Sequence, residues 1–296
     1  MHRRLLRYGS QALAITALAC VSLPGATWAY TLLPLVTEQS QTLPSGTAEA
    51  IVGFSYLNNQ RFPAFTQPGF IKSQTLAGLP QLSFRMAAGD WAEIQASYEV
   101  LYLDETAYSG RTNFEYGSGD ARLYTKVRLL KESDVRPGVG VRFGAKLPNA
   151  NRPARLGTDE VDFGIDALVS KDLGPLAVHA NLGLLLLGVP APFFGNTSTG
   201  GGQDDLLNYA IAVVSAPLGA PLPGATALRV LAEVAGQEGS HYTNERSSAR
   251  VGIQLSGGAG TFYLGISTGL VSGSERIGAS TGFIYTFEPE ALFGGD

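Results

Sequence analysis

The stretch VDFGIDALVSKDLGPLAVHANLGLLLLG, residues 161–188, is apolar enough to suggest a membrane span. It nevertheless carries several charged residues, and the sequence KDLGP interrupts it. Apolar and polar residues alternate on both sides of this interruption, as Val161 and Phe163 do with Asp162. A strand places alternate residues on opposite faces, whereas a helix would scatter the aspartates around its apolar side. The stretch therefore predicts two antiparallel strands, each with one apolar and one polar face.

The same alternation recurs along the chain. It is clear at residues 92–102, 120–129 and 139–147, and the segments AEAIVGFSYL, LPQLSFRMAAG, LLNYAIAVVSA, TALRVLAEVAG, SSARVGIQLSG, TFYLGISTGLV and ERIGASTGFIYTF repeat it. The pattern predicts about twelve strands of about ten residues, the length that a tilted strand needs to cross a bilayer. We expect an all-β fold, a single antiparallel transmembrane barrel.

The predicted connections alternate between long and short. The short turns are GDW, KESDVR, KDLG and GGAG, and the long connections are residues 58–78, 104–118, 148–160 and 189–205. Short periplasmic turns and long outer loops are typical of outer-membrane barrels. An even number of strands would place both termini in the periplasm. Phe283, Tyr285 and Phe287 then fall on the outward face at the periplasmic rim, where an aromatic girdle is expected.

The first 29 residues have the pattern of a signal peptide. MHRRLLRYGS supplies positive charge, ALAITALACVSL a short apolar region, and ATWA at 26–29 the small residues of a cleavage site. The alternative is a lipoprotein leader with Cys20 as the lipidated residue. Cys20 is the only cysteine, so the mature chain is predicted to lack disulfides and thiolate metal sites.

Composition favours a membrane barrel over a soluble domain. Only 16% of residues are charged, 37 are glycine, and the formal net charge is −4, which points to no nucleic-acid partner. No stretch after the leader approaches a membrane-spanning helix, and a closed barrel is the other structure that satisfies every backbone group in lipid. A soluble β-sandwich is disfavoured because twelve uniform strands exceed what most sandwiches use. The predicted divisions are a signal peptide at 1–29, a periplasmic or lumenal segment at 30–46, the barrel at 47–287 and a tail at 288–296.

Residues 31–42, TLLPLVTEQSQT, precede the first predicted strand. They are expected to fold into the lumen as a plug, to line the periplasmic mouth, or to form a disordered periplasmic leader. The sequence leaves these alternatives open.

Four motifs in order resemble a known family. They are GSGDARLYTKVRLL at 117–130, GVRFGAKLPNA at 140–150, LGTDEVDFGIDALVSKDLG at 156–174 and LAVHANLG at 176–183. Together they resemble the transporter family of the meta-pathway of phenol degradation, whose members are Gram-negative outer-membrane β-barrels. The family usually has PTG where this chain has PNA at 148–150. The resemblance implies envelope transport of small, often aromatic molecules and provides no substrate-site residue.

Charged residues recur on the faces that the alternation turns inward. The predicted lumen-lining residues are Glu93, Glu99, Arg122, Lys126, Arg128, Arg142, Lys146, Asp162, Asp166, His179, Arg229, Glu233, Arg250 and Arg276, with Asp120 on the same face. Two basic strands thus lie between two acidic ones. This arrangement predicts either a transverse field that orients polar or anionic solutes or a cross-strand ion-pair ladder that fills the lumen. Twelve strands lie between packed eight-stranded and open sixteen-stranded barrels, so both alternatives stand.

No catalytic, cofactor or metal site is predicted. His179 is expected to face the lumen near the KDLG turn, which does not suit a lipid-facing His–Ser pair. His241 falls in an outer loop, and the acidic pairs of GTDEVD and GGGQDD lack the spacing of a calcium loop. Phe193 and Phe194 in the seventh connection are a candidate gate for an apolar solute.

The sequence therefore predicts a non-enzymatic outer-membrane barrel that passes small, hydrophobic or aromatic compounds without energy coupling. The alternative is a structural or surface-interaction barrel with a closed lumen. The expected partners are outer-membrane lipids, a small-molecule solute and the barrel-assembly machinery, with no nucleic acid.

Overall fold

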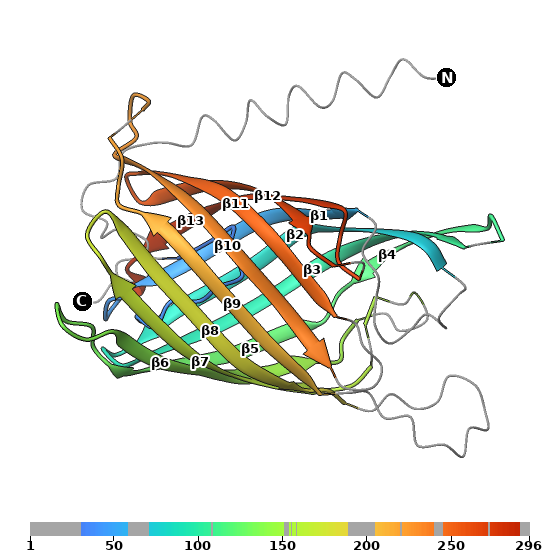
Figure 1. The fold of residues 1–296 in the computed structure, drawn as a ribbon, viewed down its shortest axis with the longest axis horizontal. Helices are drawn as coiled ribbons and strands as arrows, with labels where there is room; N and C mark the ends of the chain where they lie inside the picture. Colours follow the sequence, from blue (N-terminus) through green and yellow to red (C-terminus); the bar gives the residue numbers. More distant parts are fainter. Residues whose placement is uncertain are drawn as a thin grey trace.

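The computed structural model describes residues 31–58, 71–107, 109–150, 154, 156–157, 159–188, 205–219, 221–239, 245–271 and 273–290, which form an antiparallel β-barrel (Figure 1). Its strands are β1 (Ala48–Asn58), β2 (Ile71–Ala88), β3 (Ala92–Ala107), β4 (Thr112–Ser118), β5 (Ala121–Leu130), β6 (Gly138–Leu147), β7 (Asp162–Asp172), β8 (Leu176–Leu186), β9 (Leu206–Ser215), β10 (Ala227–Gly239), β11 (Arg246–Gly257), β12 (Gly260–Gly269) and β13 (Ile277–Phe287). Within these ranges no helix has the length and apolar character needed to cross a membrane.

Twelve of these thirteen strands close a ring. Neighbours in sequence pair with one another, and β1 closes the ring on β13 from Ala48 opposite Phe287 to Asn58 opposite Ile277. β3 is the exception, because it pairs with β5 along Ala92–Ser97 and with β4 along Val100–Thr106. β5 therefore belongs to the ring, and β4 pairs only with the extension of β3. The predicted fold class, a closed twelve-stranded all-β barrel, is confirmed.

Two connections predicted as long loops are partly strand. β2 begins at Ile71, within the predicted connection 58–78, and β3 extends to Ala107 to pair with β4 inside the predicted connection 104–118. The resulting β3–β4 hairpin projects beyond the ring (Figure 1). Its aromatic face carries Tyr102 and Tyr116, whose rings stack with centroids 6.1 Å apart. Cross-strand aromatic pairs of this kind stabilise a hairpin despite its polar composition.

The outer face of the ring is apolar. Leu182, Ile211 and Ile266 leave 56%, 53% and 58% of their surface exposed on it. Their strand neighbours on the opposite face are buried or partly buried, as the alternation requires. At one end of the ring Phe287 contacts Tyr285, with centroids 5.7 Å apart, and Phe84, with centroids 6.5 Å apart. This cluster lies where the sequence predicts an aromatic girdle.

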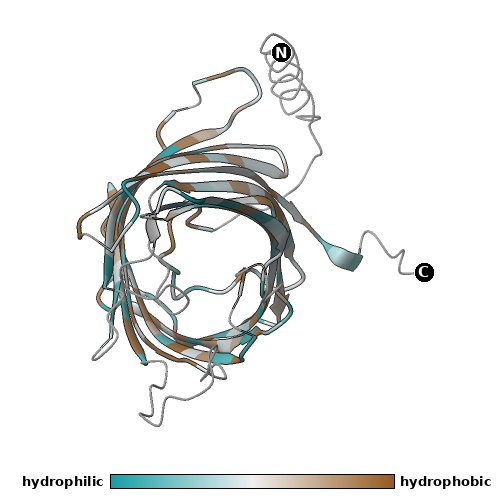
Figure 2. Cartoon of the chain, turned by 90° about the vertical axis from the view of Figure 1, so that its right-hand side faces the viewer, coloured by the Kyte–Doolittle hydropathy of each residue, from teal (hydrophilic) through white to brown (hydrophobic). Residues whose placement is uncertain are grey.

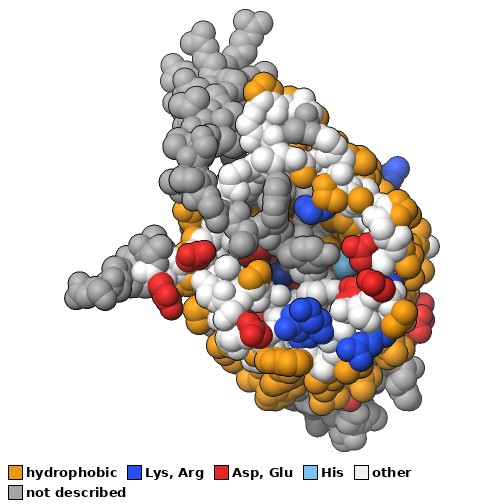
Figure 3. Space-filling model, turned by 90° about the vertical axis from the view of Figure 1, so that its left-hand side faces the viewer, with side chains coloured by type: hydrophobic (Ala, Val, Ile, Leu, Met, Phe, Trp, Pro, Cys, Tyr) orange, Lys and Arg blue, Asp and Glu red, His pale blue; other side chains and the backbone are white. Residues whose placement is uncertain are grey.

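Residues 31–47, here called the inner segment, lie inside the ring and lead into β1 (Figure 2). The segment contacts strands on opposite sides of the barrel, including Arg85 on β2 and Glu233 on β10. Seen from the left-hand end of Figure 1, charged side chains gather at the mouth, surrounded by hydrophobic side chains (Figure 3). Of the alternatives that the sequence leaves open for this segment, the structure has the lumenal one.

Candidate functional site

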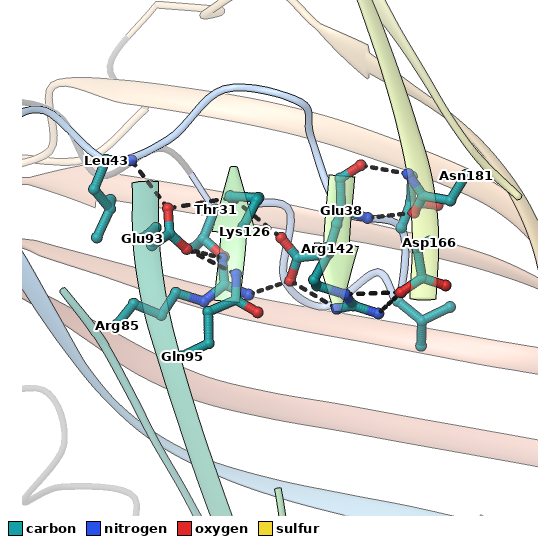
Figure 4. Close-up of polar contacts among 12 residues, drawn as sticks. Thr31, Glu38, Leu43, Arg85, Glu93, Gln95, Lys126, Arg142, Asp166 and Asn181 are labelled. Atoms are coloured by element: carbon teal, nitrogen blue, oxygen red, sulfur yellow. Dashed lines mark hydrogen bonds and ion pairs between the residues drawn. The ribbon is translucent and has the colours of Figure 1, made fainter. Parts of the chain in front are cut away.

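Glu38 of the inner segment lies among three cations of the barrel wall (Figure 4). Its Oε1 is 2.6 Å from Nη2 of Arg85 on β2 and 3.4 Å from Nη1 of Arg142 on β6. Its Oε2 is 3.5 Å from Nζ of Lys126 on β5. Three strands thus direct positive charge at a single carboxylate in the middle of the lumen.

Acidic residues of the wall hold two of these cations in place. Lys126, whose side chain is completely buried, lies 3.2 Å from Oε2 of Glu93 on β3. Arg142 donates from Nε and Nη2 to Oδ2 of Asp166 on β7, at 2.9 and 2.7 Å. Paired charges of this kind are strongly coupled because the surroundings exclude water. Lys126 and Arg142 therefore each have a wall partner besides Glu38.

The surroundings of Glu38 keep it ionised. Burial by itself would raise the pKa of this carboxyl group, but Arg85, Lys126 and Arg142 outweigh burial and lower the pKa from its ordinary 4.5 to about 2. Glu38 is therefore an anion throughout the physiological pH range.

The backbone of the inner segment is also bound by wall side chains. The amide N–H of Glu38 donates to Oδ1 of Asn181 on β8 at 2.6 Å, and Nδ2 of Asn181 donates back to the Glu38 carbonyl oxygen at 2.7 Å. The Leu43 N–H donates to Oε2 of Glu93 at 3.0 Å, and Nε2 of Gln254 on β11 donates to the Leu33 carbonyl oxygen at 2.6 Å. These bonds satisfy main-chain groups that have no strand partner.

Glu233 on β10 forms a second anchor. It accepts hydrogen bonds from the backbone N–H of Val36 at 3.0 Å, and from the N–H and the hydroxyl of Thr37 at 2.8 and 2.6 Å. Arg250 on β11 lies 2.5 Å from its other carboxylate oxygen. One wall carboxylate thus binds two consecutive residues of the segment, and Arg250 balances its charge.

Glycines of the wall make room for the segment. A Cβ at Gly252 would lie 2.5 Å from Cγ of Pro34, and a Cβ at Gly265 would also overlap the Pro34 ring. A Cβ at Gly140 would lie 3.0 Å from the carbonyl oxygen of Ser40. Any larger residue at these positions would displace the segment, so the wall is shaped to accept it.

The segment presents apolar side chains to the opposite part of the lumen. Leu32 and Leu35 are buried in a cluster with Ala212 and Val214 of β9 and Leu231 of β10. Leu33 packs against a second cluster, formed by Ile51, Tyr263 and Ile284. The lumen therefore has an ion-pair network on β2 to β7 and two apolar clusters on the remaining wall, with the Glu233–Arg250 pair on β10 and β11, and the inner segment contacts all of them.

The other predicted residues lie apart from Glu38. Lys146 bridges Asp120 and Asp162 at 3.4 and 2.8 Å, and Arg122 lies 3.1 Å from Glu99. Both groups lie toward the ends of the strands that meet the longer connections, and together they form an ion-pair ladder of the kind the sequence predicts.

His179 and three predicted arginines have other surroundings. Nδ1 of buried His179 lies 2.8 Å from Oγ of Ser170, whose hydroxyl oxygen accepts a bond from the Ser40 N–H. Arg229 lines a cavity of about 170 Å³ beside the start of the inner segment. Arg128 lies over the Trp91 ring, 5.4 Å from its centroid, and Arg276 is exposed just before β13. Phe193, Phe194 and His241 fall outside the residues that the structure describes.

The residues predicted from the sequence do not include two charged residues of the site, Glu38 and Arg85. Arg85 alternates with the outward Leu82 and Phe84, so the same parity that marks Lys126 would have placed it inside. Glu38 has no such signal because it lies in a segment without strand periodicity. In the ranges described, no group of three or more His, Cys, Asp or Glu residues is placed to hold a metal ion.

Comparison with known proteins identifies the fold. No family model matches the chain, and no curated protein matches its sequence. The crystal structure of the COG4313 outer membrane channel from Pseudomonas putida F1 has a TM-score of 0.63 at 13% identity and covers 86% of this chain and 100% of its own. The beta domain of the Bordetella autotransporter BrkA has a TM-score of 0.52 at 13% identity and covers 81% of this chain and 99% of its own. These similarities show a shared fold, the closed antiparallel β-barrel of these two outer-membrane proteins.

Proposed function

We propose that this protein is an outer-membrane channel for the passive passage of small solutes, with the inner segment narrowing the route. The apolar outer face supports placement in a bilayer, where lipid would cover it. The predicted leader supports export, and the chain would reach the membrane through the barrel-assembly machinery. The proposed location and these partners all depend on the apolar outer face.

One observation carries the channel proposal: the inner segment is bound to a ring that is complete without it. β1 pairs with β13 along the whole of both strands, and the contacts of Glu38, Val36 and Leu43 use side chains of the wall. Withdrawal of the segment would therefore break no strand pairing. It would expose a lumen with an ion-pair network on β2 to β7 and apolar clusters beside the Glu233–Arg250 pair on the remaining wall.

The two-sided lumen supports small amphipathic solutes as the class that passes. An apolar or aromatic body suits the wall near Ala212, Val214 and Leu231, and a polar group suits the side that carries Lys126 and Arg142. The resemblance to the phenol meta-pathway family favours the same class. Specificity would come from this pairing of surfaces, as in other pores.

Swelling of liposomes that contain the refolded protein tests the proposal. The chain from residue 30 onward and a chain that lacks residues 31–42 are compared with small aromatic alcohols and with sugars of increasing size. The proposal expects faster uptake in the shortened chain and measurable uptake in the longer one. A sealed barrel in both cases contradicts it.

A second candidate is a closed barrel with a structural or surface-interaction role. The inner segment favours it, because it binds the wall on opposite sides and its leucines are buried. This candidate predicts that charge-removing changes in the lumen alter stability and leave conductance unchanged, so single-channel recording of a Lys126→Gln variant separates the two.

A further inference from the structure

We infer that Arg85, Lys126 and Arg142 form a binding site for the carboxylate of a small monoanionic solute, and that Glu38 occupies this site in the present structure. The inference rests on the proposed function, because a solute must enter the lumen to reach the site. It adds the chemical class of the solute and makes Glu38 its competitor.

The contacts of Glu38 are those of a bound carboxylate ligand. Both of its oxygens are engaged, Oε1 by Arg85 and Arg142 and Oε2 by Lys126. Charge-assisted bonds of this kind are about twice as strong as neutral ones, and arginine matches the planar geometry of a carboxylate. The three cations come from three strands of the closed ring, so the wall itself fixes the arrangement.

Departure of Glu38 would leave one cation poorly paired. Lys126 would keep Glu93 and Arg142 would keep Asp166, but the remaining ion-pair partner of Arg85 would be Glu93, at 4.0 Å. An incompletely paired guanidinium in a buried site is costly. A solute carboxylate that takes the place of Glu38 would remove this cost.

Glu49 does not fill the gap. It stands directly opposite Arg85 in the β1–β2 register and is completely buried, yet neither of its carboxyl oxygens has a hydrogen-bond partner among the described residues. Arg85 thus donates its hydrogen bond to Glu38 and not to its strand neighbour. The vacated site would keep an inward guanidinium whose ion-pair partner is Glu93, at 4.0 Å.

The acidic neighbours set the charge of the ligand. Among the ion-paired groups, three cations face two wall carboxylates, Glu93 and Asp166, so departure of Glu38 leaves an excess of one positive charge. A monocarboxylate balances it, whereas a phosphate dianion would meet repulsion from the two carboxylates. The apolar wall on the other side of the lumen suits an aromatic or aliphatic body.

Competition links solute binding to movement of the segment. A ligand that binds where Glu38 binds must weaken the attachment of the segment by the same factor by which the segment weakens ligand binding. Solute binding would thereby favour the state in which the inner segment is displaced and the channel is wider.

Isothermal titration of the detergent-solubilised full barrel with benzoate tests the site, with benzamide as the uncharged probe of the same shape. We expect the Glu38→Gln variant to bind benzoate at least tenfold more tightly than the native chain, equal to about 1.4 kcal/mol. Arg85→Gln on the Glu38→Gln background should remove that gain, whereas Arg276→Gln on the same background should not. Equal binding of benzoate and benzamide, or tight benzoate binding without Arg85, would overturn the inference.

A second measurement keeps the test independent of variant folding and of transport. A nitroxide is attached at Val36→Cys in the chain from residue 30 onward, which contains no natural cysteine. Benzoate should increase the mobility of the label and benzamide should not; an unchanged label at benzoate concentrations that saturate binding overturns the competition. A barrel that binds benzoate but is sealed in liposomes refutes the channel proposal alone, and one that conducts without binding benzoate refutes the carboxylate site alone.

Discussion

Glu38 and Arg85 are bonded at 2.6 Å although 47 residues separate them in sequence. One belongs to a segment without regular structure and the other to a strand of the closed ring. The bond couples the position of the inner segment to the charge of the wall. A change in either residue should therefore alter the position or the interactions of the other.

The first prediction concerns this bond. Glu38→Gln removes the negative charge that faces Arg85, Lys126 and Arg142, and a buried ion pair that loses one partner is destabilised by roughly 3–5 kcal/mol. The inner segment should detach more often, and mean single-channel conductance should increase. Glu290→Gln, which removes an exposed carboxylate beyond β13, is the matched control and should leave conductance unchanged. Identical traces from the two variants would show that Glu38 does not hold the segment.

The second prediction follows from the pKa of Glu38, which its surroundings lower from 4.5 to about 2. A lowered pKa means that the ionised form stabilises the docked segment above pH 4.5, and that this contribution is lost as the pH falls from 4.5 toward 2. The full contribution is roughly 3 kcal/mol. The contribution of Glu38 to conductance should therefore be constant between pH 5 and 8, and its loss should raise conductance in more acidic solution.

Comparison with Glu38→Gln isolates this effect, because other lumenal carboxylates also titrate at low pH. In the variant, the acid-induced rise in conductance should be smaller by the part that protonation of Glu38 causes. A rise in conductance of the same size in both proteins would assign the effect to other groups.

The third prediction uses the fit between Gly252 and Pro34. An alanine Cβ at position 252 would overlap the proline ring, so Gly252→Ala should push the segment away and raise conductance. Pro34→Ala removes the Cγ and Cδ atoms that cause the overlap, and adding it should reduce the effect of Gly252→Ala on segment position, as measured by the label at residue 36. Gly219→Ala, where a new Cβ meets nothing within 4 Å, is the control. Independent, additive effects of the two changes would argue against direct contact.

The barrel was predictable from the sequence because period-two alternation is a local property. Asp162, Asp166 and Lys126 all lie on the buried face that their strand neighbours imply. The β3–β4 hairpin was not predicted, since the polar residues around Tyr116 resemble a loop until the pairing with Tyr102 is known.

The site was predictable only in part. The alternation of apolar and polar residues marks four wall residues as inward-facing: Lys126, Arg142, Glu93 and Asp166. It does not mark Glu38, the residue that they surround. Glu38 contacts Lys126 and Arg142 although they lie 88 and 104 (142 − 38) positions further along the chain, and no pattern near Glu38 encodes those distances. The sequence also does not mark the glycines that contact the segment, because nothing in the sequence distinguishes them from other strand glycines.

The last prediction tests which face of the barrel meets lipid. Ile211, in the middle of β9, leaves 53% of its surface exposed on the apolar face, whereas Asn208 of the same strand has the opposite parity and faces the lumen. A lysine on the lipid face near the bilayer centre costs about 2–4 kcal/mol, and one in a polar lumen costs much less. Ile211→Lys should therefore lower the free energy of unfolding from phospholipid vesicles by that amount, measured in urea, while Asn208→Lys should change it by less than about 1 kcal/mol. Greater damage from Asn208→Lys than from Ile211→Lys would mean that the apolar face does not lie in lipid, and the proposed membrane placement would then be wrong.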